Sequence, residues 1–125
     1  LKRELGISII LITHDLALIA EISDRVAIMY AGKIVEYGLS EQIYGDPLHP
    51  YTRGLILSVP KLRGELRELA WIPGVPPDLR QPPSGCRFHP RCSMRMPICD
   101  KEEPSLTEVE PGHYVACWLY SSDSR

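Results

Sequence analysis

Residues 8–38 read SIILITHDLALIAEISDRVAIMYAGKIVEYG, and this stretch predicts an α/β fold. Residues 7–13 are almost entirely apolar, which is typical of a strand in a parallel sheet that is covered on both faces. Residues 26–30 and 33–37 read VAIMY and KIVEY on either side of an Ala-Gly pair, and two strand-like segments around such a tight turn predict a β-hairpin. The fold class is therefore the end of an α/β domain: a parallel strand, a helix and a hairpin.

Short helices are predicted on either side of the hairpin. Asp15 is a suitable N-cap for the first helix, whose buried face would carry Leu16, Ile19 and Ala20. Ser40 is expected to cap a second helix that reaches Tyr44.

Proline marks the helices and loops that follow. Pro50 suits the first position of a third helix that runs to about Ser58. Residues 61–69 form a further amphipathic pattern. The segment 73–90 is so rich in proline that we expect an extended strap without regular structure.

The strap leads to a group of four cysteines, Cys86, Cys92, Cys99 and Cys117. Five, six and seventeen residues separate successive cysteines. Thiolates clustered in this way indicate a structural metal or an iron–sulfur cluster, although the gaps are wide for a zinc knuckle. Incidental thiols and two disulfides are the alternatives, and nothing in the sequence signals the oxidising environment that disulfides need.

Composition excludes several classes of function. A net charge of −2 and a pI near 6.1 argue against general nucleic-acid binding, which needs a basic surface. The apolar runs are much shorter than the roughly 20 residues that span a bilayer. Because the chain starts without methionine and inside what looks like a helix, we interpret it as a fragment of a longer protein.

The stretch from Ser8 to Gly38 resembles the end of an ABC-transporter ATPase domain, from the strand before the switch-loop histidine to the hairpin after it. The resemblance implies that His14 contacts the γ-phosphate of ATP and orients the attacking water. Phosphoryl transfer depends mainly on positioning and charge stabilisation, so a histidine at this point is chemically suitable. From the residues alone, a loop histidine that bonds to nearby backbone is an equally good interpretation.

The later motifs resemble the C-terminal region of oligopeptide and dipeptide transporter ATPases. They read DPLHPYTRGL, IPGVPPDL, PPSGCRFHPRC and GHYVACWL, and with the first stretch they cover nearly the whole chain. The resemblance implies an ATPase subunit that binds ATP and Mg²⁺ at the cytoplasmic face of the membrane. Its partners would be a second ATPase subunit, membrane permease subunits and a separate peptide-binding protein, with no nucleic acid.

Most of the ATP-binding machinery is missing from the sequence. It has no G-x-x-x-x-G-K-S/T phosphate loop, no strand that ends in a metal-binding aspartate and catalytic glutamate, and no ABC signature segment. We therefore expect this chain alone to be inactive as an ATPase.

Some peptide-transporter ATPases carry a four-iron (4Fe–4S) cluster on matching cysteines, so the resemblance favours this cluster over Zn²⁺ for the four-cysteine site. Arg87, Arg91 and Arg95 lie between the cysteines and could offset the charge of a thiolate-bound cluster, or simply form a solvated basic loop. His89 and His113 lie near cysteines, but four thiolates already complete a ligand set.

The sequence thus predicts two parts: residues 1–45 as the end of a nucleotide-binding domain, and residues 46–125 as a peptide-transporter extension with the four-cysteine site. The transported substrate is left open, since related systems also move metals or oligosaccharides. The alternative is a stand-alone metal-binding interaction module without ATPase activity.

Overall fold

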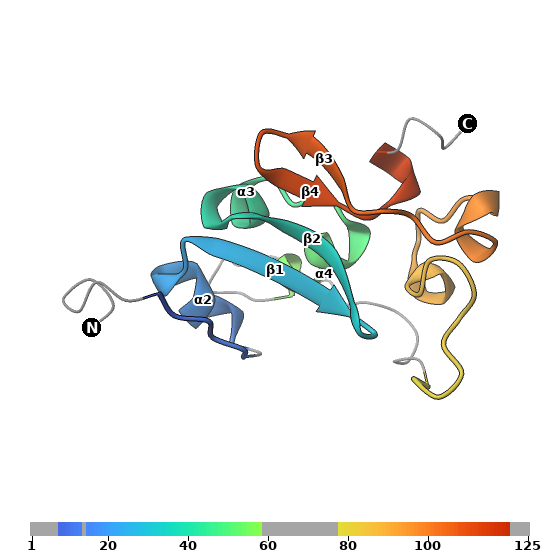
Figure 1. The fold of residues 1–125 in the computed structure, drawn as a ribbon, viewed down its shortest axis with the longest axis horizontal. Coiled ribbons are helices and arrows are strands. Elements are labelled where there is room, and N and C mark those ends of the chain that lie inside the picture. Colours follow the sequence, from blue (N-terminus) through green and yellow to red (C-terminus); the bar gives the residue numbers. More distant parts are fainter. Residues whose placement is uncertain (1–7, 14, 59–77, 121–125) are drawn as a thin grey trace.

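The computed structural model describes residues 8–13, 15–58 and 78–120 of the chain. Figure 1 shows a four-stranded sheet in the order β1-β2-β4-β3, with every neighbouring pair antiparallel. The strands are β1 (Arg25–Tyr30), β2 (Lys33–Leu39), β3 (Thr107–Glu110) and β4 (His113–Val115). The last strands of the chain therefore extend the sheet that the hairpin begins.

The predicted hairpin is confirmed, and its turn explains the Ala-Gly pair. Tyr30 pairs with Lys33 across a two-residue loop in which Ala31 has φ 50° and Gly32 has φ 82°. Positive φ at both central positions gives the turn that follows the right-handed twist of the strands.

Three α-helices are described: α2 (Leu16–Ile22), α3 (Ser40–Gly45) and α4 (Pro50–Leu57). Asp15 caps α2 as expected, because its side chain accepts a hydrogen bond from Leu18 N at 3.1 Å. The expected cap of α3 is wrong by one residue. Ser40 is already helical, and the Gln42 side chain accepts a hydrogen bond from the backbone N–H of the N-cap residue, Leu39.

The N-terminus of α4 combines the predicted Pro50 with a buried histidine. His49 caps the helix through Nδ1, which accepts a hydrogen bond from Tyr51 N at 3.0 Å. Burial lowers the pKa of His49 to about 4, with a smaller contribution from nearby Arg53. The imidazole is thus neutral near pH 7, which leaves the Nδ1 lone pair available for the cap.

Two expectations for the start of the chain fail where the structure describes it. Residues 8–13 form no strand, and the described sheet is wholly antiparallel and does not include them. Ile10 and Ile12 are 92% and 94% exposed, because no described residue covers them. Helix α2 likewise has no buried residue, and only Ile19 of its expected apolar face packs against the core.

The core lies between one face of the hairpin and the segments that cover it. Its buried residues come from both strands of the hairpin, from α3 and α4 and from the cysteine-containing segment: Val26, Ile28, Tyr30, Val35, Ile43, Ile56 and Phe88. The Phe88 ring lies 5.1 Å from that of Tyr30, nearly perpendicular to it. Phe88 thereby anchors the proline-rich segment to the hairpin. The boundary predicted after residue 45 stays a prediction.

Apart from α4 and the β3–β4 hairpin, the described residues of the extension have little regular structure, as expected. Beyond the β3–β4 hairpin, its described part contains three 3₁₀ turns, η1 (His89–Arg91), η2 (Pro97–Asp100) and η3 (Trp118–Tyr120). The predicted helix over 61–69 and residues 73–77 of the strap lie outside the described residues. Within the described ranges, no helix is long and apolar enough to cross a membrane.

Candidate functional site

The cysteine lobe, which we define as residues 84–100 together with Cys117, forms the right-hand side of the molecule in Figure 1. Cys86 N donates a hydrogen bond to the carbonyl oxygen of Cys99 at 2.8 Å, and Ser84 Oγ donates to that of Asp100 at 2.7 Å. These two bonds close residues 84–100 into a loop. The fold thus brings cysteines that are distant in sequence into one small region.

Two of the four sulfur atoms accept a hydrogen bond from the backbone. Met94 N donates to Cys92 Sγ at 3.4 Å, and Met96 N donates to Cys99 Sγ at 3.3 Å. The backbone N–H groups of Phe88 and Leu119 also act to lower the pKa of Cys86 and Cys117, although burial outweighs them. N–H groups aimed at sulfur stabilise the thiolate, the form that binds metals.

Burial opposes ionisation of these thiols. It raises the pKa of Cys86 and Cys92, and raises that of Cys117 to about 12. The other three cysteines each raise the pKa of Cys117 further, so all four thiols lie within electrostatic reach of one another. Without a cation, Cys86, Cys92 and Cys117 are therefore neutral near pH 7.

The described residues contain no group of three or more His, Cys, Asp or Glu side chains arranged to hold a metal ion. The four cysteines are thus neighbours without converging on one point. A metal site at these cysteines stays a prediction.

The interleaved arginines dock the lobe onto the hairpin. Arg87 donates to the carbonyl oxygen of Ala31, and Arg91 donates to Tyr30 Oη at 3.2 Å. Arg95 instead forms an exposed ion pair with Asp100 at 3.8 Å. The first two arginines therefore have structural contacts, and their expected offset of cluster charge stays a prediction.

A buried carboxylate of the hairpin joins it to two other parts of the extension, the start of α4 and strand β4. Glu36 of β2 is fully buried and accepts hydrogen bonds from Leu48 N at 3.0 Å and His49 N at 2.9 Å. Its Oε2 also lies 2.6 Å from Nε2 of His113, which is fully buried in β4. Since a carboxylate only accepts hydrogen bonds, Nε2 carries the proton. One side chain thus joins the hairpin, the start of α4 and the last strand.

Sequence reasoning missed this contact. Its only signal was a glutamate inside the otherwise apolar run of β2, a position where a charged side chain needs partners. His113 is not aimed at the cysteines, and Nδ1 of His89 bonds to the Cys86 carbonyl oxygen at 2.8 Å. His14, the predicted catalytic residue, lies outside the described residues.

The sequence resemblance implied a hairpin followed by a proline-rich extension with four cysteines, and the structure packs Phe88 of this extension into the core of the hairpin. The family described as "Oligopeptide/dipeptide transporter, C-terminal region" matches residues 35–99, which include most of β2, all of α3 and α4, and three of the cysteines. The chain belongs to this family, and the predicted resemblance is confirmed.

Curated relatives agree over nearly the whole chain. It is 50% identical to the dipeptide transport ATP-binding protein DppD of Caldanaerobacter subterraneus subsp. tengcongensis over 96% of its length. It is 49% identical to the oligopeptide transport ATP-binding protein OppD of Bacillus subtilis over 99%, and 47% identical to OppD of Salmonella typhimurium over 94%. The chain spans only 37%, 35% and 35% of the lengths of these relatives.

The contacts of Glu36 lead to a prediction about stability. Replacing Glu36 with Gln puts an amide N–H₂ against buried donors, so we expect Glu36→Gln to lower the free energy of unfolding by about 2 kcal/mol. Exposed Glu41 of α3 is the matched control, and Glu41→Gln should stay within about 0.5 kcal/mol of the parent. Urea unfolding followed by circular dichroism measures both. Equal stability of the two variants would show that the buried contact contributes little.

A second prediction concerns Gly85, which has φ 67° at the start of the cysteine lobe. A Cβ there would collide with the Cys99 carbonyl oxygen and with the backbone of Asp100 and Lys101. We expect Gly85→Ala to abolish protection of the Cys86 amide from hydrogen exchange. Gly112→Ala is the control, because Gly112 has φ 75° with nothing within 4 Å of its Cβ position, and it should cost only about 1 kcal/mol of backbone strain. Unchanged Cys86 protection in Gly85→Ala would contradict this account of the lobe.

Proposed function

We propose that this chain is the C-terminal part of the ATPase subunit of an importer that couples ATP hydrolysis to the uptake of dipeptides or oligopeptides. The single observation that carries this proposal is the 50% identity, over 96% of the chain, to a dipeptide transport ATP-binding protein. The family match over residues 35–99 supports the same conclusion independently.

Within such a subunit, this chain supplies His14 and a structural extension. ATP and Mg²⁺ would be held chiefly by a phosphate loop and acidic residues, which this sequence does not contain. His14 would touch the transferring phosphate and orient water. We therefore propose that the chain alone does not hydrolyse ATP.

The proposed partners follow from the same assignment. They are a second ATPase subunit, the permease subunits that span the membrane and a separate peptide-binding protein, with the ATPase located peripherally at the cytoplasmic face. The alternative function, a stand-alone metal-binding module, is favoured only by the missing phosphate loop.

The proposal includes one four-iron cluster bound by Cys86, Cys92, Cys99 and Cys117. Its support is the electrostatic coupling among the four thiols and the backbone N–H groups that donate to the sulfurs of Cys92 and Cys99. When bound, the iron would supply the positive charge that keeps the four thiolates ionised. The chain itself supplies the donors that orient the sulfurs and the arginine contacts that hold the lobe against the hairpin.

The sequence resemblance favours a cluster over a single Zn²⁺. One zinc ion would require its four thiolates to converge on a point about 2.3 Å from each sulfur. A four-iron cube binds each thiolate at a different corner, so its ligands stand farther apart. Zn²⁺ remains the alternative that the test below distinguishes.

The transport assignment is tested in the longer ATPase that contains this sequence. We expect His14→Ala to lower the rate of ATP hydrolysis at least about tenfold with little change in nucleotide affinity, because the contact is made mainly in the transition state. Glu21→Ala, an exposed change on α2, is the control and should keep the parent rate. Phosphate release and nucleotide binding are measured separately. Hydrolysis by His14→Ala at the control rate would remove His14 from the catalytic site.

The cluster is tested by anaerobic purification of the chain. We expect a brown protein with absorbance near ~400 nm and about four irons per chain. Replacing any one of the four cysteines with serine should lower the iron content, whereas Ser93→Ala, beside Cys92, should not. A colourless protein with one zinc per chain would replace the cluster with the zinc alternative.

A further inference from the structure

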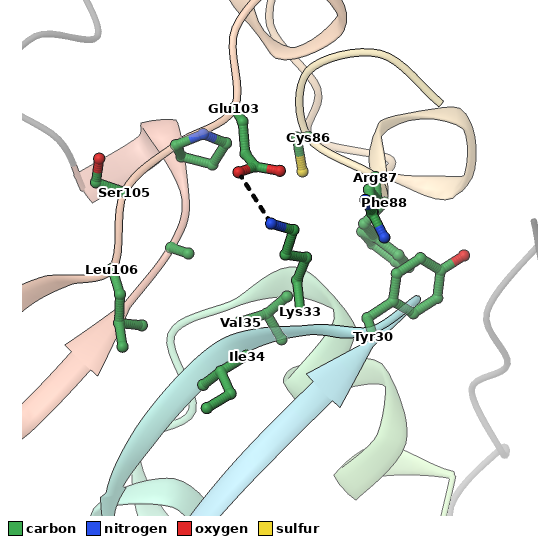
Figure 2. A pocket seen from close by; sticks show the side chains of 12 residues that line it. Tyr30, Lys33, Ile34, Val35, Cys86, Arg87, Phe88, Glu103, Ser105 and Leu106 are labelled. Carbon is green, nitrogen blue, oxygen red and sulfur yellow. Dashed lines mark ion pairs between the residues drawn. The ribbon is translucent and has the colours of Figure 1, made fainter. Parts of the chain in front are cut away.

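A pocket of about 370 Å³ opens between the end of the hairpin, the cysteine lobe and residues 103–106. Figure 2 shows the side chains that surround it. The volume lies at the lower end of the range of small-ligand sites. Of the four cysteines, only Cys86 borders it, so the pocket is not the place where the four thiols meet.

The floor of the pocket is apolar. Tyr30, Val35 and Phe88 line it and belong to the buried core, so this surface is rigid. Ile34 and Leu106 also line the pocket but remain 42% and 43% exposed. These two side chains leave apolar area that a ligand would cover.

Opposite charges face each other across this floor. Lys33 Nζ lies 3.6 Å from Glu103 Oε2, and Figure 2 shows the lysine extending toward the glutamate. Both side chains are about half exposed, and an exposed ion pair of this kind contributes only about 0–1 kcal/mol. A ligand that replaces this ion pair therefore loses little free energy by breaking it.

The third charged group at the pocket is already engaged. Arg87 borders the cavity, and its guanidinium donates to the Ala31 carbonyl oxygen. This contact fixes Arg87 at the edge of the pocket. Lys33 and Glu103 are thus the two charged groups that can turn toward a bound molecule.

We propose that this pocket binds a short zwitterion, a dipeptide or amino acid with a free ammonium group, a free carboxylate and an apolar side chain. The ammonium group would bind Glu103, the carboxylate would bind Lys33, and the side chain would cover Ile34 and Leu106. An anion without an ammonium group would be repelled by the carboxylate of Glu103. A cation without a carboxylate would be repelled by Lys33 and Arg87. A zwitterion matches both signs of charge together with the apolar floor.

The choice of a dipeptide as the ligand rests on the proposed function. In the ATPase subunit of a peptide importer, such a site would sense the concentration of imported peptide on the side of the membrane where ATP is hydrolysed. A bound peptide would contact both the cysteine lobe and the hairpin, because both contribute residues to the pocket wall.

The test is titration of the 125-residue chain with L-alanyl-L-leucine, followed by calorimetry and by amide chemical shifts. N-acetyl-alanyl-leucine and alanyl-leucine amide each lack one charge, so each should bind at least about tenfold more weakly. Lys33→Met and Glu103→Gln should weaken binding of the free dipeptide to a similar extent. Arg80→Gln, which removes an exposed ion pair with Asp78 outside the pocket, is the matched control and should bind like the parent.

Two outcomes would overturn the proposal. One is the absence of binding up to about 10 mM dipeptide, a concentration that detects even very weak complexes. The other is binding that survives both capped peptides or both pocket variants. Since the titration involves neither nucleotide nor transport, its failure leaves the ATPase assignment intact, and failure of the His14 test leaves this binding result intact.

Discussion

The buried carboxylate of Glu36 is the contact on which the arrangement of the chain depends. A charged group with no access to water is tolerated only when its oxygens are fully satisfied, and here the partners come from three separate segments. The hairpin, the start of α4 and β4 are therefore stable only together. The aromatic contacts of Phe88 add the cysteine lobe to the same core. These contacts join the hairpin to the described part of the extension, and the boundary predicted after residue 45 stays a prediction.

The cysteine lobe has the opposite character. It contains no long helix and few buried apolar residues, and short backbone hydrogen bonds and arginine contacts hold it. Burial raises the pKa of Cys86, Cys92 and Cys117, whereas the backbone N–H groups that donate to the sulfurs of Cys92 and Cys99 would stabilise thiolates. A bound cation, as proposed, would reconcile these opposing effects. Metal binding and ordering of this lobe are thus expected to be linked.

Local signals predicted local structure well. The Ala-Gly turn, the Asp15 cap and Pro50 at the start of α4 depend on neighbouring residues, so the sequence was sufficient to predict them. The predicted strand over 7–13 was not found in its described part, because strand formation requires partners that periodicity does not supply. The pairing of β2 with β4 and the bond between Glu36 and His113 are long-range contacts without a local pattern. For the candidate site, sequence reasoning identified the four cysteines and could not establish how their sulfurs are oriented.

The sheet order β1-β2-β4-β3 places strands that are far apart in sequence side by side. His113 follows Glu36 by 77 residues, so the ribosome completes the hairpin well before the partner of its buried carboxylate has been synthesised. Until then Glu36 must stay hydrated and the edge of β2 must stay unpaired, a state that is open to non-native strand pairing. Closing so long a loop is also intrinsically slow. Folding of the hairpin during synthesis is therefore expected to finish only after the last strand has left the ribosome.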